Sequence, residues 1–408
     1  MQVLKPLTLL CLLYNSLLVA EDSTLKDYIS KNKKEQFKYE YEKNEAEASK
    51  LRDSWIAPLQ LQYIYSRSKP GAKELTRENT AIIMDQPIFQ SGGIYYGIKF
   101  ANASKKYLDY SVEVAQVKMI KVTLSILMQI KQSTLKVKSQ KLKIQNAEIN
   151  LKLKRDQYLS GQLDSGFLDD AMIERNRVIS LLYDLQTSKE LLVTSFKTLS
   201  DSPYETLNIP HFSLMSEDEF MQYNLAVKQS QAEVEKSDYS RDIIRSKYLP
   251  KVNLTAGYTW SSNEQFIDND LTFKTNIASY NYGLKASMPL DINSFRDMES
   301  AKVDFLKSKV VVEDKRREQK ALFLQTLYSI DNYEKKIALA QDNIEIYTKL
   351  LEDTKELFTA GYKTEYDVTL LNNSLELQKY DTQVYEIDKQ LSLLELYEVY
   401  MNDVKGNR

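Results

Sequence analysis

One long stretch without helix breakers restricts the fold of this chain more than any other feature. Residues 100–158 contain neither proline nor glycine. A helix over this stretch, at about 1.5 Å per residue, would be roughly 90 Å long. The whole chain of 408 residues has only 10 Gly and 8 Pro, which indicates few, long elements. The composition therefore argues against the roughly two to three globular domains that the length alone suggests.

Four other segments follow the two-residue period of a strand. They are residues 55–67, 80–89, 249–262 and 278–290, with approximate ends. In the first, Leu59, Leu61 and Tyr63 alternate with glutamines, and the third and fourth alternate as clearly. Such a pattern predicts strands with one apolar and one polar side. Pro87 and Pro289 stand where we expect the second and fourth strands to end, because proline cannot donate to a strand ladder.

The same elements recur in the same order, about 200 residues apart, which predicts two structural repeats, residues 21–206 and 207–408. Each repeat reads as helix, two strands, long helix, glycine turn and helix. Helices are expected over residues 23–52 (Ser23 as N-cap), 168–199 and 216–247. The second long helix, ending near Phe358, has apolar residues every seven positions (Phe323, Ile330, Ile337, Ile344, Leu351), which predicts a coiled-coil-like neighbour.

The four strands allow two interpretations. They form either a soluble sheet with one packed face or a membrane-spanning sheet, for which their length is sufficient. Short uncharged residues on the polar side, and Trp55, Trp260 and tyrosines within the segments, favour a water-filled lumen and aromatic girdles. Four strands cannot close a barrel, and open edges in lipid leave backbone groups without partners. Three copies would give twelve strands, whereas two would give eight, with a lumen filled by side chains.

The first 20 residues are predicted to be a secretory signal peptide, with Lys5 before an apolar run and a small Ala20 at its end. A lipoprotein interpretation would place Cys11, the only cysteine, at the new N-terminus, but the preceding residues lack the small side chains that such processing prefers. No disulfide is expected in the mature chain, so its stability must come from packing or assembly. No later stretch has the ~20 apolar residues of a transmembrane helix.

Charge and residue inventory exclude several functions. The net charge is −2 and the charges are mixed along the chain, so nothing indicates nucleic-acid binding. His211 is the only histidine, and without cysteine or a second histidine there is no ordinary zinc site or nucleophile–histidine pair. No phosphate-binding loop is present. We therefore expect no enzyme activity, no metal and no cofactor, and energy for any transport must come from a partner.

The plan of the chain resembles the TolC-like outer-membrane efflux proteins over essentially the whole mature sequence. The resemblance rests on PIFQSGG (87–93), KYLPKVNLTAGY (247–258) and the paired turns SGQLDS (160–165) and AGYKTEYDV (360–368). It implies a mainly helical homotrimer with a 12-stranded β-barrel in the outer membrane of a Gram-negative bacterium and a long α-helical barrel in the periplasm. It also implies a periplasmic adaptor protein and an inner-membrane pump as partners, together with outer-membrane lipid.

The resemblance also implies roles for individual residues. At the barrel–helix junctions these are Pro87, Gly92, Gly93, Pro250 and Pro289. The second junction, DINSF, lacks the usual glycines, although Asn293 can take unusual backbone angles there. At the periplasmic tips, the adaptor-contacting residues are Gly161, Asp164, Ser165, Gly361 and Thr364, with Ser165 and Thr364 as matching hydroxyls.

The resemblance places the periplasmic gate at Asp367, with Lys363, Tyr362 and Glu365 beside it. Leu370 stands where the family has a second carboxylate, so the gate is reduced to one ring or supplemented by Glu365. Three symmetry-related carboxylates would raise one another's pKa and favour cations. The alternative is that Asp367 only serves the first turn of a helix, where the dipole favours a negative charge.

The predicted function is the passive outer-membrane exit duct of a tripartite efflux or type I secretion system, and the sequence does not separate these two. The alternative from another class is a secreted coiled-coil structural or adhesive protein without channel activity. The heptads and the charge would suit it, but it explains the repeated strand pairs and the proline positions poorly.

Overall fold

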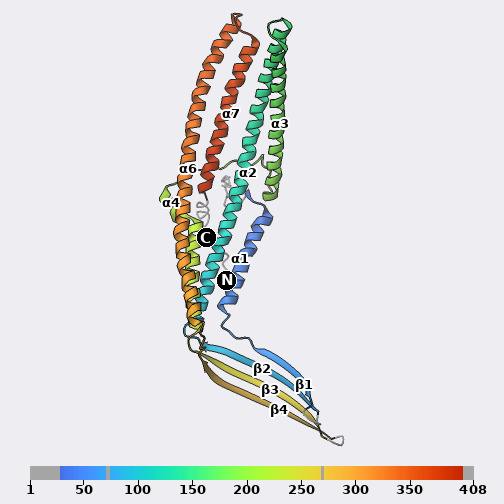
Figure 1. Ribbon diagram of the computed structural model, residues 1–408, viewed down its shortest axis with the longest axis vertical. Coiled ribbons are helices and arrows are strands. Elements are labelled where there is room, and N and C mark those ends of the chain that lie inside the picture. Colours follow the sequence, from blue (N-terminus) through green and yellow to red (C-terminus); the bar gives the residue numbers. More distant parts are fainter. Residues whose placement is uncertain (1–27, 70–73, 268–270, 398–408) are drawn as a thin grey trace, which may run out of the picture.

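The computed structural model describes residues 28–69, 74–267 and 271–397. The molecule is elongated, with long helices that run along its length and a four-stranded sheet at one end (Figure 1). The predicted signal peptide, including Cys11, lies outside the described residues.

Seven helices are described, and the bounds of each follow: α1 Lys31–Arg52, α2 Gly93–Leu159, α3 Ser165–Leu199, α4 Glu217–Tyr223, α5 Leu225–Lys247, α6 Ser294–Thr359 and α7 Glu365–Leu396. The longest are α2 with 67 and α6 with 66 residues, about 100 Å each. No helix within the described part of the chain is both long and apolar enough to cross a membrane.

The helices differ from the prediction at several points, and α3 begins at Ser165, three residues earlier than expected. The N-cap of α1 is Ser30, and Ser23 lies outside the described residues. α2 begins at Gly93, earlier than predicted, because Gly92 takes a left-handed conformation and starts the helix directly after the sheet. The helix expected over 216–247 is interrupted at Asn224, whose buried side chain accepts a hydrogen bond from the backbone of Val227 and starts a new helix.

The sheet contains four antiparallel strands in the order β1-β2-β3-β4. Their bounds are β1 Gln60–Ser68, β2 Leu75–Phe89, β3 Lys251–Ile267 and β4 Leu271–Ser287. Compared with the prediction, β1 begins later, and β2, β3 and β4 extend further toward the hairpin loops. Backbone pairing continues there although the polar sequence no longer alternates. Pairing of β4 stops at Ser287, two residues before Pro289.

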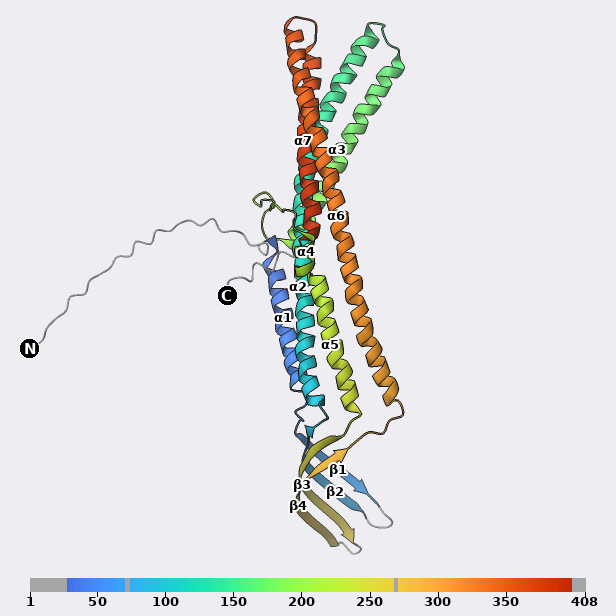
Figure 2. The ribbon, with the colours of Figure 1, turned by 90° about the vertical axis from the view of Figure 1, so that its left-hand side faces the viewer.

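The buried core lies where the helices meet at mid-length. α2 contributes fully buried Ile120, Leu124 and Leu127, and they share one cluster with Phe196 of α3 and Leu393 of α7. α2 packs against α3 and α7 above this level and against α1 and α5 below it. This helix therefore connects both levels of the molecule to the sheet (Figure 2).

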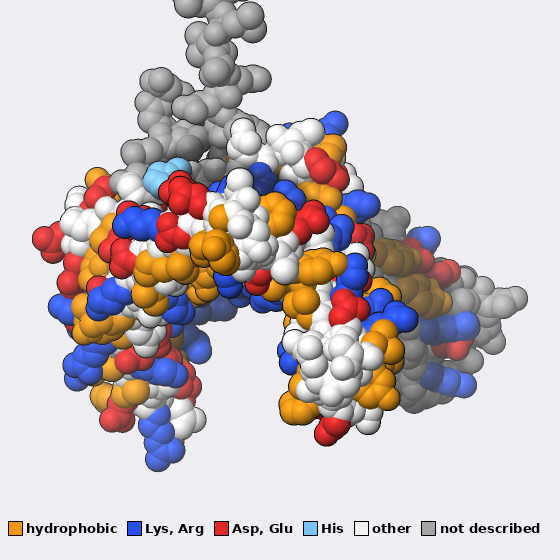
Figure 3. Space-filling model, turned by 90° about the horizontal axis from the view of Figure 1, so that it is seen from above, with side chains coloured by type: hydrophobic (Ala, Val, Ile, Leu, Met, Phe, Trp, Pro, Cys, Tyr) orange, Lys and Arg blue, Asp and Glu red, His pale blue; other side chains and the backbone are white. Residues whose placement is uncertain are grey.

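Two antiparallel hairpins, α2/α3 and α6/α7, form the end of the molecule away from the sheet (Figure 2). The predicted seven-residue pattern of α6 places Phe323, Ile330, Ile337 and Leu351 in buried positions. Ile344 is half-buried. Phe358 is 45% exposed because it lies beside the turn at the tip of the hairpin. Seen from above, the space-filling surface has a deep notch between two lobes, each mixing charged and apolar groups (Figure 3).

Candidate functional site: a sheet face and two hairpin tips

One face of the sheet is apolar and exposed. The register places Leu61 opposite Ile82, Ile82 opposite Tyr258 and Tyr258 opposite Tyr280, so these four side chains form a row on the same face. Leu61 is 75% and Tyr280 74% exposed. An exposed apolar surface that continues over several rows marks a site of protein or membrane contact.

Aromatic side chains dominate the rows beside this one. The rings of Tyr258 and Trp260 lie 4.5 Å apart, and those of Tyr280 and Tyr282 are stacked at 6.4 Å. Toward the hairpin loops the same face becomes charged, where Arg67 and Glu74 form an ion pair at 2.7 Å. The face therefore has an apolar band with aromatic groups and a polar rim, as membrane barrels have.

Trp55 does not belong to this band. It precedes β1, in a turn, and its carbonyl accepts a hydrogen bond from Gln86 Nε2 at 3.1 Å. The prediction of Trp55 as a strand residue was wrong because β1 begins only at Gln60. The turn at residues 53–56 has its own local hydrogen bonds, among them Ile56 N to Asp53 O.

The opposite face of the sheet is mainly polar. Asn253 Nδ2 donates to Asp85 Oδ1 at 2.6 Å, and Ser261 Oγ donates to Asn79 Oδ1 at 2.9 Å. The apolar exceptions include Ile64 and Ile83. Besides Lys285, which alternation already placed here, the register brings Arg77, Asp85 and Lys251 to this face; these four are listed from the pairing of the strands.

The first junction between sheet and helix is tighter than predicted. Pro87 does not end β2: it still stands opposite Asn253, and the register shifts between Pro87 and Phe89. Ser91 and Gly92 have left-handed φ values of 47° and 91°, which is why glycine is favoured at 92. Gly93 serves another need, since a Cβ there would lie 2.8 Å from Ser246 Oγ.

The second junction is bonded to the first. Ser91 Oγ donates to the carbonyl of Pro250, directly before β3, at 2.6 Å. Asn293 has an ordinary helical φ of −80° and does not use its freedom to adopt unusual backbone angles. Its backbone amide donates to Asp291 Oδ1 at 2.9 Å, and this hydrogen bond makes the turn without a glycine.

Tyr248 and Asp297 connect α5 to α6 at this second junction. The Tyr248 hydroxyl donates to Asp297 Oδ2. This hydrogen bond to a carboxylate, with burial as a further cause, raises the pKa of Tyr248 to about 12.

The two hairpin tips have the same backbone geometry. Gly161 and Gly361 have φ values of 72° and 83°. At each tip the next amide reaches back to a carbonyl five residues earlier, Gln162 to Gln157 and Tyr362 to Leu357, both at 2.8 Å. This is the helix ending in which a left-handed residue satisfies the last carbonyls. No atom lies within 4 Å of a Cβ built at either glycine, so the backbone angle, and not space, requires glycine.

The helices that leave the tips begin at corresponding positions. Asp164 caps α3 by accepting from Gly166 N at 2.6 Å, and Thr364 caps α7. Ser165 is the first residue of α3, so the counterpart of Thr364 is Asp164 and not Ser165. Gly166 is required next to this cap because a Cβ would stand 3.0 Å from Asp164 Oδ1.

Asp367 forms a capping box with Thr364. Its Oδ2 accepts from the backbone amide and from the hydroxyl of Thr364, each at 2.9 Å. The hydrogen bond from the backbone amide of Thr364 holds the pKa of Asp367 below its ordinary value, and the hydrogen bond from the Thr364 hydroxyl and the nearby charge of Lys363 act in the same direction. Tyr362 is 80% exposed, and Lys363 and Glu365 are exposed beside it. In one chain Asp367 thus stabilises the start of α7 and is held in its charged form.

A contact between the two hairpins at this level was not predicted. Lys152 Nζ of α2 lies 5.1 Å from the ring centroid of Tyr366 at the start of α7. A hydrogen bond to Tyr366 raises the pKa of Lys152. Lys152 and Tyr366 belong to different repeats, and no sequence signal connects them.

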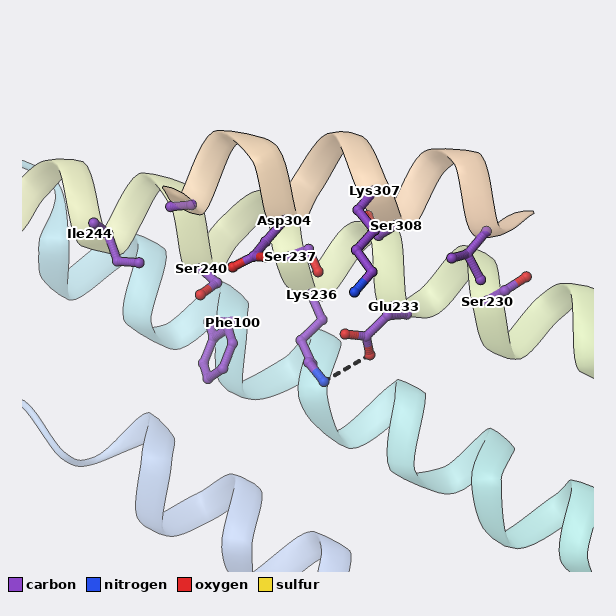
Figure 4. Close-up of a pocket in the computed structure, with 12 residues that line it drawn as sticks. Phe100, Ser230, Glu233, Lys236, Ser237, Ser240, Ile244, Asp304, Lys307 and Ser308 are labelled. Carbon is purple, nitrogen blue, oxygen red and sulfur yellow. Dashed lines mark hydrogen bonds and ion pairs between the residues drawn. The ribbon is translucent and has the colours of Figure 1, made fainter. Parts of the chain in front are cut away.

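A cavity lies lower down between α5 and α6, with Phe100 of α2 at its floor (Figure 4). Glu233 and Lys236, one turn apart on α5, form an ion pair of 2.8 Å in its lining. Small side chains such as Ser240 and Ser308 leave the space between the helices. This arrangement balances its own charges and defines no particular ligand.

No group of histidine, cysteine and acidic side chains that could hold a metal is found among residues 28–69, 74–267 and 271–397. His211 lies exposed in the linker between α3 and α4. The features with functional geometry are therefore the exposed sheet face and the hairpin tips. Together they define a class: an elongated helical protein with a small antiparallel sheet at one end that exposes an apolar face.

Comparisons with known proteins give a family match for the second half of the chain and a fold for nearly all of it. Residues 218–399 match the family model of outer membrane efflux proteins. No curated protein matches the sequence. The fold is similar to that of the outer membrane protein VceC of Vibrio cholerae, with 14% identity, 88% of this chain and 91% of that chain covered, and a TM-score of 0.65.

Two further solved structures share the fold. The CmeC outer membrane channel of Campylobacter jejuni has 15% identity, coverage of 94% and 87%, and a TM-score of 0.68. The MtrE outer membrane channel of Neisseria gonorrhoeae, in its open state, has 10% identity, coverage of 92% and 87%, and a TM-score of 0.65. The resemblance predicted from the sequence is confirmed: residues 218–399 match outer membrane efflux proteins, and the chain has the fold of outer membrane channels.

Proposed function

We propose that the chain is one protomer of a homotrimeric exit duct, which carries substrates passively from the periplasm across the outer membrane. The observation that carries this proposal is the apolar sheet face with Leu61, Tyr258 and Tyr280 exposed, at one end of helices of about 100 Å. β3 and β4 have 17 residues each, more than the ~9–11 that a tilted strand needs to span a bilayer.

The sheet edges support a trimer. β1 and β4 are the outer strands of the sheet, so each has one side without a pairing partner among the described strands. In lipid, each backbone N–H or C=O group that lacks a hydrogen-bond partner costs several kcal/mol. Pairing of β4 with β1 of the next copy removes both edges, and three copies give a barrel of twelve strands with the polar face toward a lumen.

The helices offer a second surface for the same assembly. α6 packs on α5 and α7 but leaves a stripe of apolar side chains exposed along its length. The large apolar residues of α6 that are more than half exposed are Phe295, Val303, Val310, Tyr328, Leu339 and Ile346, at 54% to 79%. Contact with a neighbouring copy would bury this stripe and continue the barrel wall upward.

We propose that the hairpin tips contact a periplasmic adaptor, which couples the duct to an inner-membrane pump. Supporting this, both tips have the same rigid glycine turn and expose apolar groups, Leu159 at 71% and Tyr362 at 80%. Gly161, Asp164, Ser165, Gly361 and Thr364 are the proposed contact residues.

The gate proposal concerns Asp367, with Lys363, Tyr362 and Glu365. Since hydrogen bonds from Thr364 lower the pKa of Asp367, each copy brings a charged carboxylate to the tip. Three such charges near the symmetry axis would favour cations at the entrance. The hydrogen bonds of the capping box support the purely structural role equally, so only an experiment separates the two.

The experiment is conductance of the detergent-extracted protein in a planar bilayer. Asp367→Asn removes the charge and keeps an oxygen that can accept from Thr364 N, and Asp164→Asn is the matched control at the other tip. Changed cation preference in Asp367→Asn alone supports the gate. Equal currents in all three proteins keep the duct and remove the gate. A protein that needs no detergent and gives no current refutes the duct and returns the coiled-coil alternative.

A further inference from the structure

The lumen side of the sheet has a charge pattern of its own. The register assigns every strand residue to one of two faces. Arg77, Lys251 and Lys285 share the polar face with one acid, Asp85. Among the strand residues whose side chains are described, no other charged group lies on this face, so its net charge is +2 per chain.

Lys251 and Lys285 stand together at the end of the sheet near the helices. Lys251 pairs with Ser287, and Lys285 pairs with Asn253, so the two lysines are diagonal neighbours on β3 and β4. Such positions have Cα atoms about 7–8 Å apart. Both side chains are exposed, and in the described structure neither lysine forms an ion pair.

The single acid of this face neutralises only part of the charge of the lysines. Asp85 stands opposite Thr255, and its carboxylate accepts the amide of Asn253 at 2.6 Å. An amide is a neutral partner, so Asp85 keeps its own charge and offsets one of the two lysines. Lys251, Lys285 and Asp85 together leave a net charge of +1 per chain at this end of the sheet, and Arg77 supplies the other positive charge nearer the hairpin loops.

We propose that Lys251 and Lys285 form a basic ring at the base of the barrel lumen, which attracts anionic solutes as they pass from the helical part into the barrel. The inference rests on the proposed trimer, in which three copies bring six lysines to one level. Rings of lysine or arginine select anions in pores, and low-dielectric walls strengthen their field. The duct would thus combine an acidic entrance at the hairpin tips with a basic ring where the helical part meets the barrel.

The test is the reversal potential of the trimer in a planar bilayer under a KCl gradient. We expect the double variant Lys251→Gln/Lys285→Gln to lower the chloride-to-potassium permeability ratio about twofold or more at 0.1 M salt. The difference should fade at 1 M, where the Debye length falls from ~10 Å to ~3 Å. Asp85→Asn should shift the ratio the other way.

Lys274→Gln is the matched control. Lys274 lies on β4 as Lys285 does, but on the apolar side, opposite Glu264, and removal of its charge should leave the ratio unaltered. A double variant that conducts with the wild-type ratio, or a control that shifts it equally, overturns the basic ring. Absence of current in the wild-type protein would instead refute the proposed duct.

Discussion

Gly361 offers the sharpest test of how the hairpin tips are built. Its φ of 83° lies in the left-handed region, which costs a residue with a side chain about 1–2 kcal/mol. No atom within 4 Å of the added Cβ would contribute a steric cost. Gly361→Ala should therefore lower the stability of the tip by about 1–2 kcal/mol, through the backbone alone.

Hydrogen exchange by mass spectrometry measures this cost locally. The turn is held by the amide of Tyr362, which donates to Leu357 O at 2.8 Å. A loss of 1–2 kcal/mol raises the population of open tips about 5- to 30-fold, and amides of residues 357–368 should exchange faster by that factor. Gly361→Asn should have a smaller effect because Asn tolerates this conformation.

Gly97 gives a control of opposite sign. It lies in α2 with open space around it, and its φ is not in the left-handed region. Alanine is favoured over glycine in a helix by about 1 kcal/mol, so Gly97→Ala should leave exchange in its segment equal or slower. Unchanged exchange at the tip of Gly361→Ala, with Gly97→Ala behaving as expected, would refute the role given to the left-handed glycine.

Three further predictions concern the core, the sheet and the tip cap. Leu127→Ala should lower the free energy of unfolding by about 2–5 kcal/mol, because Leu127 is fully buried in α2; an unchanged thermal midpoint in detergent would contradict this. Trp260→Arg on the apolar face should impair insertion into vesicles by about 2–4 kcal/mol, whereas Ser261→Arg on the polar face should insert normally; equal behaviour of both would argue against the assignment of faces. The pKa of Asp367 is lowered in the folded chain, so its contribution is present above the ordinary aspartate pKa and is lost as pH falls through the lower, folded value. Hydrogen exchange of the α7 start should therefore accelerate only in acid, and Thr364→Ala, which removes part of the cap, should weaken this pH dependence.

Much of the fold could be predicted from local patterns. The absence of breakers over residues 100–158 predicted α2, which the structure extends to Gly93–Leu159. Alternation separated Tyr258 and Trp260 from Asn253 and Thr255, and their two faces follow directly because a strand has a period of two. The glycine turns at 161 and 361 were also evident, since few other residues adopt their backbone angles.

Errors arose where distant segments determine the local structure. Pro87 was expected to end its strand, but pairing with β3 continues past it to Phe89. Gly93 was predicted as a residue of the junction between strand and helix. The structure shows a different need for glycine there, because a side chain would collide with Ser246, on a helix of the other repeat. Asn293 needed no unusual backbone, because Asp291 makes the turn with its own side chain.

The sequence by itself determined the elements, their lengths and which side of each strand is apolar, because periodicity and breaker residues act within a few positions. Only the tertiary structure decided which side chains from different segments meet. The register of β3 with β4 brings Lys251 near Lys285, and the packing of α2 beside α7 brings Lys152 to Tyr366. Such contacts depend on the alignment of segments far apart in the chain, which no local pattern specifies.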